Sequence, residues 1–404
     1  MNRFKRFYCR VFQMVFRLAL PVLPYRQPEV LQSLSEIPPL LQRRQIHTVL
    51  LVTDREIRAL GLSAPLEQAL QAAQIRCCVY DGTVPNPTID NVEAARECYE
   101  SNGAQAIIAF GGGSAMDCAK AAGARIVKPR QSVSQMKGLL HVHRRLPLLV
   151  AVPTTAGTGS ETTLAAVITD AKTHHKYPIN DFSLIPHVAV LDETVTLGLP
   201  KGITASTGMD ALTHAVEAYI GRSTTAQTRQ MAERATRLIH DNLLRAYEDG
   251  TDRQARQNML QAAYCAGVAF TKSYVGYVHA LAHALGGQYR IPHGLANAVI
   301  LPHFLKAYGA ACHRPLAKLA RLTGIAGSDT ADAAAAEAFI AWVEQMNAAM
   351  GIPKTLDGIR TEDIARMARY ADQEANPLYP VPRLMDRTEL AQMFEQIRTK
   401  EELV

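Results

Sequence analysis

The chain has 404 residues, of which 48% are hydrophobic and 20% are charged. These proportions are ordinary for a globular protein, and the length accommodates two or three domains. The 43 basic and 37 acidic residues leave a net charge of +6, too small an excess to predict nucleic-acid binding, and no nucleic-acid motif is present. The seven cysteines are odd in number and form no CxxC pair, so we expect a reducing compartment, the cytoplasm.

The N-terminus predicts a basic amphipathic helix, the first part of an extension assigned to residues 1–44. Its apolar run is too short and too often broken for a membrane span, and no small-residue cleavage site follows it. We expect this helix to pack against its own protein or a second subunit. The alternative is a weak, peripheral contact of residues 1–28 with an anionic membrane surface. The apolar stripe of the predicted helix consists of Phe4, Phe7, Val11, Val15 and Leu18.

From about residue 45 strands alternate with helices, which predicts a parallel sheet covered by helices. The apolar run Val49–Val52 indicates a strand buried on both faces, and Asp54 follows it. A carboxylate at this position of a dinucleotide-binding fold accepts hydrogen bonds from the ribose of NAD and repels the 2′-phosphate of NADP. The next predicted elements are a helix at 66–74, a strand at 77–80 and a helix at 90–101.

The segment AQAIIAFGGGSAMDCAK runs from a strand through three glycines and a serine directly into a helix. Glycines let backbone N–H groups approach a pyrophosphate, and the helix N-terminus adds partial positive charge. The segment therefore predicts a phosphate-binding turn. It is not GxGxxG and does not follow the first strand, so the standard fingerprint is absent, and a tight turn without a ligand stays the alternative.

A further apolar strand, Leu148–Val152, ends in a loop crowded with Thr, Gly and Ser. Hydroxyl groups and bare backbone at the carboxyl end of a strand suit a ligand crevice. A strand at 187–192 completes the sheet. We therefore predict an α/β dinucleotide-binding domain with a Rossmann-like parallel sheet at 45–200, followed by an all-α metal-binding domain at 201–404. The predicted helices of the second domain span 207–220, 228–248, 255–270, 278–286, 295–308, 330–350 and 361–371.

Metal-type side chains recur in the predicted helical domain. Asp210 and His214 are four residues apart and so lie on one face of a helix. His279 and His283 repeat that spacing, and His293 follows a Gly-Gly break. One carboxylate with imidazoles suits Fe²⁺ or Zn²⁺ better than Mg²⁺ or Ca²⁺. The spacing predicts a metal site, but it does not decide between His279 and His283.

Four blocks in the same order resemble the signature blocks of the iron-containing (group III) alcohol dehydrogenases, over roughly residues 45–395. The resemblance implies a metal-dependent alcohol dehydrogenase or aldehyde reductase that moves a hydride between a primary alcohol and NAD. It implies Fe²⁺, with Zn²⁺ as the alternative, a small alcohol or aldehyde as substrate, and a homodimer or higher homo-oligomer. The blocks are GGGSAMDCAK, VPTTAGTGSETT, GMDALTHAVEAY and HALAHALGGQYRIPHGLANAVILPH.

The resemblance also assigns site residues. His283 is left as the catalytic candidate that relays a proton. Apart from the resemblance, Glu217 lies seven residues after Asp210 on the same helical face, and we expect it to support a ligand rather than to be a solvated carboxylate. The implied metal ligands are Asp210, His214, His279 and His293. The implied cofactor-binding residues are Asp54, Asn86, Gly112, Gly113, Ser114, Thr154, Thr155 and Lys176.

The chain also departs from the family pattern. The segment FTKSYVGYVH is bulkier than in common relatives and is expected to bring Lys272, Tyr274 and Tyr277 near the substrate. Two alternatives share the fold, a glycerol dehydrogenase and a dehydroquinate synthase-like enzyme. A third alternative, from another class, is a non-catalytic protein that binds a membrane surface through its N-terminal segment.

Overall fold

The computed structural model describes residues 1–171 and 175–399. The chain divides by its internal contacts into two compact units. One contains the parallel sheet, and the other is helical and includes both ends of the chain. The first comprises residues 24–198, and the second residues 1–23 with 199–404.

The predicted extension at residues 1–44 is divided between these two units. Its second part forms strand β1 (Glu29–Leu31) and helix α2 (Ile37–Arg43) of the sheet unit. β1 pairs in parallel with β9 (Val188–Val190), so this part of the chain is an edge of the sheet and not an extension. Three residues give too short a pattern for a strand to be recognised in the sequence.

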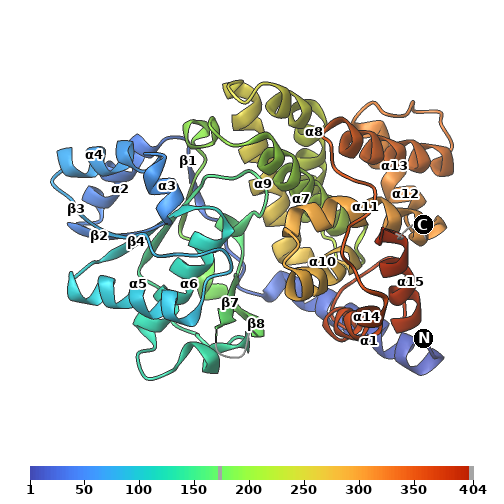
Figure 1. The fold of residues 1–404 in the computed structure, drawn as a ribbon, viewed down its shortest axis with the longest axis horizontal. Coiled ribbons are helices and arrows are strands. Elements are labelled where there is room, and N and C mark those ends of the chain that lie inside the picture. The colour runs from blue at the N-terminus through green and yellow to red at the C-terminus, as the bar shows by residue number, and fades with distance from the viewer. Residues whose placement is uncertain (172–174, 400–404) are drawn as a thin grey trace. The chain divides into compact units, whose positions relative to one another are not determined.

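The main sheet has six parallel strands in the order β1-β9-β6-β4-β2-β3, which confirms the predicted α/β fold (Figure 1). The chain runs from β2 to β3 at one edge and then returns to β4 on the other side of β2. The winding thus reverses between β2 and β4. In open α/β sheets, ligands bind outside the carboxyl ends of the strands at such a reversal. The remaining strands span Thr48–Val52 (β2), Arg76–Tyr80 (β3), Ala106–Gly111 (β4) and Leu148–Pro153 (β6).

Helices cover both faces of this sheet. Val49 and Leu51 of β2 belong to a core with α2 and α4, whereas Leu50 and Val52 belong to the opposite core with α5 and α6. This division follows from the alternation of side chains along a strand. All four of these side chains are fully buried, as the unbroken apolar run predicted. The covering helices span Ala64–Ala72 (α4), Ile89–Ser101 (α5) and Gly113–Val127 (α6).

A second, smaller sheet with the order β5-β8-β7 was not predicted. Its central strand contains Lys176 and Pro178 in place of an apolar run, which removes the usual strand signal. Its strands span Gly138–Leu139 (β5), Ala165–Asp170 (β7) and His175–Asn180 (β8), and the short helix α3 spans Arg55–Ala59. Short 3₁₀ helices lie at Leu20–Val22, Leu34–Glu36, Val133–Met136, Ser160–Thr162, Phe182–Leu184 and Glu193–Thr196.

The second unit is all helical over its described residues, as predicted. Helices α7, α8 and α9 pack against one another, α10 packs against α11 and α14, and α12 packs against α13. Helices α12 and α15 were not predicted. The helices span Lys201–Ile220 (α7), Ala226–Glu248 (α8), Arg253–Ser273 (α9), Tyr277–Tyr289 (α10), His293–Tyr308 (α11), Ala310–Leu322 (α12), Asp332–Ala349 (α13), Thr361–Ala375 (α14) and Arg387–Ile397 (α15).

The N-terminal helix α1 (Arg3–Ala19) packs against this helical unit. The side chain of Asn2 caps it by accepting a hydrogen bond from the backbone N–H of Lys5 at 2.8 Å. The buried Gln13 donates to the carbonyl oxygen of Tyr379 at 2.8 Å. No helix within residues 1–171 and 175–399 has the length and apolar character needed to cross a bilayer.

Candidate metal centre

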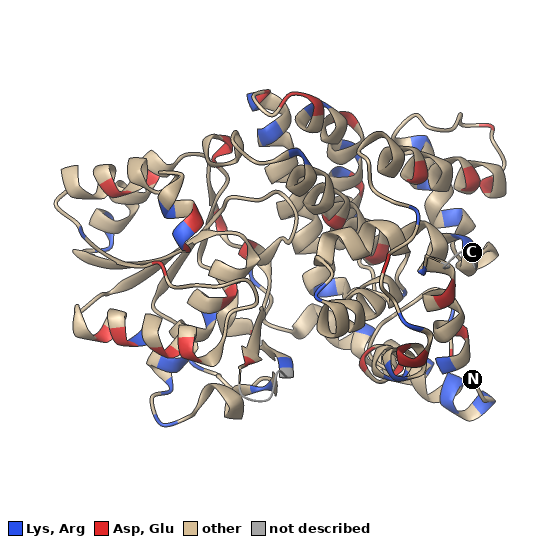
Figure 2. Cartoon of the chain, viewed as in Figure 1, with Lys and Arg blue, Asp and Glu red and all other residues tan. Residues whose placement is uncertain are grey.

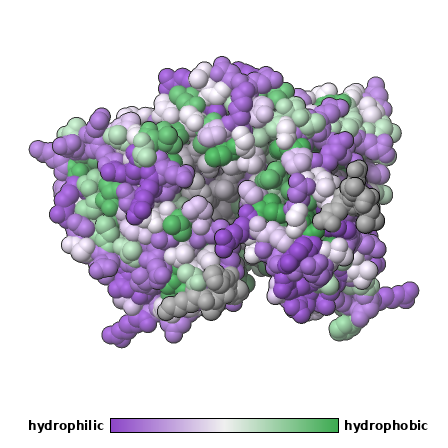
Figure 3. Space-filling view, in the orientation of Figure 1, coloured by the Kyte–Doolittle hydropathy of each residue, from purple (hydrophilic) through white to green (hydrophobic). Residues whose placement is uncertain are grey.

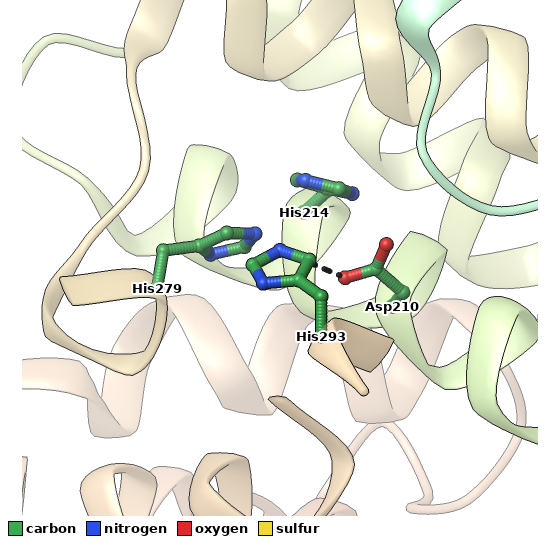
Figure 4. A group of neighbouring side chains, drawn as sticks. All are labelled: Asp210, His214, His279 and His293. Atoms are coloured by element: carbon green, nitrogen blue, oxygen red, sulfur yellow. Dashed lines mark ion pairs between the residues drawn. The ribbon is translucent and has the colours of Figure 1, made fainter. Parts of the chain in front are cut away.

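Four side chains from three helices of the helical unit converge in one cluster. Asp210 and His214 lie one turn apart on α7, His279 lies on α10, and His293 begins α11 (Figure 4). One potential ligand atom from each residue lies within 4.8 Å of the other three. The first three residues are buried, whereas the side chain of His293 is 38% exposed and marks the open side of the cluster.

Close packing of α7 against its neighbours brings these residues together. The ring of Phe270 on α9 stacks on His214 with 4.1 Å between ring centroids. At the start of α11, a Cβ atom at Gly294 would overlap the backbone carbonyl oxygen of Ser206, so only glycine allows this approach to α7. The approach places Nε2 of His293 3.7 Å from Oδ1 of Asp210.

Glu217 lies two turns beyond Asp210 on α7 and supports His279. Its Oε2 is 2.6 Å from Nδ1 of His279, and it also accepts hydrogen bonds from the backbone N–H groups of Gly276 and Val278. The hydrogen bond at Nδ1 leaves Nε2 of His279 directed into the cluster. Glu217 therefore makes the kind of contact expected of a residue that supports a ligand.

Burial shifts the pKa values of this pair in opposite directions. It raises the pKa of Glu217 to about 7, although the backbone hydrogen bonds oppose the shift. It lowers the pKa of His279 well below its ordinary value, and the neighbouring imidazoles lower it further. The lowered pKa favours the neutral form of His279, which is the form that binds a metal.

The amide of Asn297 lies among the potential ligand atoms of three of the four residues. Its Nδ2 donates to Oδ1 of Asp210 at 2.7 Å, and it lies 3.1 Å from Nε2 of His293 and 3.3 Å from Nε2 of His279. Asn297 is fully buried and lies one turn after His293 on α11. We did not predict it, although a lone amide in the apolar run LANAVIL was the available signal.

His283 lies beside the cluster but contributes no ligand atom to it. Its ring stacks on that of His293 with 5.1 Å between centroids, and its Nδ1 is 2.6 Å from Oε1 of Glu374 on α14. The hydroxyl of Tyr379 donates to the same carboxylate oxygen at 2.6 Å. Nothing in the sequence pointed to Glu374 or Tyr379, because they lie about 90 residues beyond His283 in a stretch without a recognised motif.

The prediction that Tyr277 lies near the substrate is wrong. Its side chain is fully buried, and its hydroxyl donates to Oδ1 of Asn376 at 2.9 Å and accepts from the backbone N–H of Met385 at 3.0 Å. Tyr277 therefore ties α10 to the C-terminal part of the unit. Tyr274 packs edge-on against Phe16 of α1 with 5.0 Å between ring centroids.

In the sheet unit, six of the eight predicted cofactor residues follow the carboxyl ends of the adjacent strands β2, β4 and β6. These ends flank the reversal of winding described above, so the residues meet at one edge of the sheet. The backbone of Gly112 lies close to the Thr155 side chain, since a Cβ atom at Gly112 would be 3.6 Å from Oγ1 of Thr155. The six residues are Asp54 after β2, Gly112, Gly113 and Ser114 after β4, and Thr154 and Thr155 after β6.

The other two predicted cofactor residues join this edge through hydrogen bonds. Nζ of Lys176 donates to Oδ1 of Asn86 at 2.7 Å, and the backbone N–H of Asn86 donates to Oγ of Ser114 at 3.3 Å. Asp54 also caps α3, since its Oδ1 accepts a hydrogen bond from the backbone N–H of Ile57 at 2.8 Å. The structure thus brings all eight residues to the same end of the sheet.

A hydrogen-bond network around the buried Lys120, in the same unit, was not predicted. Lys120 on α6 is fully buried, and its Nζ donates to the carbonyl oxygen of Ser160 at 2.6 Å and to Oγ1 of Thr163 at 2.8 Å. Asp117 accepts from Oγ of Ser160 at 3.1 Å and from the backbone N–H of Val167 at 3.1 Å. Asp117 and Lys120 fix the Thr- and Ser-rich loop against α6. The available signal in the sequence was a pair of charged residues three apart in the small-residue segment AMDCAK.

Comparisons with known proteins agree with the resemblance found in the sequence. The model described as "Iron-containing alcohol dehydrogenase" matches residues 30–193, and that described as "Fe-containing alcohol dehydrogenase family, C-terminal" matches residues 204–398. The two matches together cover most of both units. They leave the first 29 residues outside.

Individual relatives match over nearly the whole chain. The 1,3-propanediol dehydrogenase of Klebsiella pneumoniae is 37% identical over 388 residues, which cover 95% of this chain and 98% of the relative. The NAD-dependent methanol dehydrogenase of Bacillus methanolicus is 35% identical, with 85% and 90% covered. The crystal structure of a 1,3-propanediol oxidoreductase superposes with a TM-score of 0.88 at 36% identity and covers 92% of this chain and 99% of its own.

Proposed function

Because the chain belongs to the iron-containing alcohol dehydrogenase family and is an oxidoreductase of alcohols and aldehydes, we propose that a divalent metal and NAD(H) serve its reaction. The metal site is the cluster of Asp210, His214, His279 and His293. The single observation that carries this proposal is the convergence of four ligand atoms within 4.8 Å. Iron is the first choice, in line with the family description, and zinc is the alternative.

The donor set fits such an ion. One carboxylate and three imidazoles match the ligands that Fe²⁺ and Zn²⁺ accept, and they do not form the oxygen shell that Mg²⁺ or Ca²⁺ prefers. The lowered pKa of His279 favours the form that binds a cation, and the contact with Glu217 at Nδ1 orients its ring. The exposed edge of His293 leaves one side of the cluster open to solvent.

When bound, the metal supplies a Lewis acid that polarises the oxygen of the substrate, and the nicotinamide accepts or donates the hydride. The residues of the chain prepare this reaction. Glu217 holds the orientation of His279 through the bond at Nδ1. We assign proton transfer to His283, because its ring stacks on that of His293 and the contact of its Nδ1 with Glu374 holds its orientation beside the cluster.

The proposed site for NAD is the carboxyl edge of the sheet. The glycines at the start of α6 expose backbone N–H groups to a pyrophosphate, and the helix N-terminus adds partial positive charge. Lys176, held by Asn86 beside Ser114, adds a cation at the same place. Oδ2 of Asp54 remains for the ribose hydroxyls, because Oδ1 is engaged in capping α3.

The test begins with metal analysis of protein purified without oxygen, followed by oxidation of NADH against a panel of small aldehydes. We expect about one metal ion per chain and metal-dependent NADH oxidation. Protein that reduces aldehydes equally well after chelation would refute the metal assignment. Activity on glycerol alone would favour the glycerol dehydrogenase alternative. The two family models that match this chain describe alcohol dehydrogenases and so favour the first proposal.

Two finer parts of the proposal concern the state of the protein in the cell. We propose that the protein is a homo-oligomer and that it resides in a reducing compartment. The seven cysteines support the reducing compartment, because all of them are free thiols. Light scattering of the purified protein measures its mass and so tests whether it is a homo-oligomer. A monomer at micromolar concentration would contradict it.

A further inference from the structure

The N-terminal helix α1 is attached to the helical unit by the side that carries its polar contacts. Nζ of Lys5 pairs with Oδ1 of Asp372 at 3.0 Å, and Gln13 donates to a buried carbonyl oxygen. The guanidinium of Arg10 donates to the carbonyl oxygens of Val381 and Pro382 at 2.8 and 2.9 Å. An amphipathic helix of a globular protein usually buries its apolar side. Helix α1 does the opposite.

The apolar side of α1 faces away from the protein. Phe4 is 81% exposed, Phe7 69%, Val15 57% and Leu18 73%, and we name these four residues the exposed stripe. At 100° per residue they fall within about 80° of one another around the helix. Val22, which follows at the end of the 3₁₀ turn, is 83% exposed. Large side chains gathered in this way on a surface mark a place of interaction.

Positive charge flanks the exposed stripe. Arg3, Arg6 and Arg17 are exposed, lie on one flank of the helix, and form no ion pair with any described residue. Helix α1 contains Lys and Arg but no Asp or Glu, and its N-terminal end is blue in Figure 2. Residues 1–28 contain six of the 43 basic residues of the chain and none of its 37 acidic residues, so the rest of the chain carries 37 of each. The whole net charge of +6 therefore lies in this segment.

This segment lies outside the regions that the family models match. The family models begin at residue 30, so α1 is not part of the region on which the alcohol dehydrogenase assignment rests. Figure 3 shows a hydrophobic group beside hydrophilic side chains at the lower right, where Figure 1 places the N-terminal end of α1. An exposed apolar stripe here has no role in either of the sites described above.

We propose that α1 binds the surface of an anionic lipid bilayer, with the exposed stripe in the acyl boundary and the arginine flank at the lipid headgroups. Aromatic and aliphatic side chains on one side and arginines on the next are the features of a helix that lies in a membrane interface. The charge of the segment complements an anionic headgroup layer. The polar contacts of Lys5, Arg10 and Gln13 hold the helix on the enzyme, so the enzyme would bind the membrane peripherally.

A second copy of the chain is the competing occupant of the stripe. Two copies that met through α1 would bring their arginine flanks together, and no acidic residue on the helix compensates that charge. An anionic lipid layer removes this repulsion. The charge pattern therefore favours the membrane.

The experiment is flotation of the intact protein with vesicles of phosphatidylcholine alone or with about one third phosphatidylserine. We expect the protein to float with the anionic vesicles and not with the neutral ones, and to be released by high salt. The triple variant Arg3→Gln, Arg6→Gln, Arg17→Gln should lower the partition coefficient about 100-fold, or roughly fivefold per arginine. The double variant Phe4→Ser, Leu18→Ser should lower it at least about tenfold.

A matched control removes the same charge elsewhere in the helical unit. The triple variant Arg314→Gln, Lys318→Gln, Lys354→Gln alters three exposed basic residues and should bind vesicles like the unmodified protein. Circular dichroism and the melting temperature should be unchanged in all variants, since none of these side chains is buried.

Three results would overturn the proposal. The first is an unmodified protein that stays at the bottom of the gradient with anionic vesicles. The second is equal loss of binding in the control triple variant and in the α1 triple variant, because binding would then depend on total charge alone. The third is a fall in oligomer mass of the Phe4→Ser, Leu18→Ser variant without vesicles, with vesicle binding unchanged, because a second copy would then cover the stripe.

Discussion

The proposed metal centre and the proposed cofactor edge are built from different parts of the chain. The proposed metal centre consists of four side chains from three helices, and three of these side chains are buried. Glu217 and Asn297 contact Asp210, His279 and His293 at distances of 2.6 to 3.3 Å. The cofactor edge consists largely of backbone and small residues at the ends of strands. Its side-chain contacts link only a few members, such as Lys176 and Asn86.

This difference bears on how each site tolerates change. A metal site loses a ligand when one side chain is removed, and its neighbours cannot replace that atom. A site of several backbone N–H groups distributes the binding of a phosphate and keeps most of it when one side chain changes. We therefore expect large effects from single substitutions in the helical unit and smaller, selective effects at the edge of the sheet.

The largest effect should come from the ligands themselves. His279→Ala and His293→Ala should each abolish both bound metal and activity, because three ligands leave the ion under-coordinated. The metal-to-protein ratio after anaerobic purification and the rate of NADH oxidation measure the two losses. If the metal instead survives His293→Ala and is lost in His283→Ala, the assigned ligand set is wrong.

Substitution of His283 should have a smaller effect than loss of a ligand, and it should change turnover without changing the metal content. His283→Ala should keep the metal and lower the turnover number about 100-fold, because it removes the group proposed to carry the proton. Glu374→Gln should lower the turnover number by a smaller factor, because glutamine keeps the hydrogen bond to His283 and removes the negative charge. Unchanged pH–rate profiles in both variants would refute proton transfer by His283.

The supporting carboxylate should matter less than a ligand. Glu217→Gln should weaken metal binding or activity by about 10- to 100-fold, as is usual for residues that orient a ligand. The matched control is Glu233→Gln on the neighbouring helix α8, where the carboxylate accepts from the hydroxyl of Tyr219 at 2.8 Å. Equal metal affinity in the two variants would show that His279 does not depend on Glu217.

The smallest effect is expected at the cofactor edge. A 2′-phosphate about 4 Å from Asp54 would be repelled by up to about 4 kcal/mol at an effective dielectric constant near 20, and a third of that gives about tenfold preference for NAD. Asp54→Asn keeps the cap on α3 and removes the charge, so the Michaelis constant for NADP should fall while turnover with NAD changes little. Equal catalytic efficiency with NADH and NADPH in the unmodified protein would contradict the role of Asp54.

Local sequence patterns predicted most of the elements around both sites. The apolar run before Asp54 and the glycines after β4 predicted β2 and the turn into α6. The patterns failed where few residues carried them, as in β1, or where Pro178 broke the alternation, as in β8. The edge of the sheet at residues 29–31 depends on pairing with β9, more than 150 residues away, which no local pattern contains.

The sequence by itself determined that Asp210 and His214 share one helical face and that His279 and His283 share another, because the period of the α-helix fixes both relations. It did not determine which histidine of the second pair would point into the cluster. The tertiary structure decided that through two carboxylates, since Glu217 on α7 holds His279 and Glu374 on α14 holds His283. Both contacts join helices that only the packing of the whole unit brings together, so spacing along the chain carries no information about them.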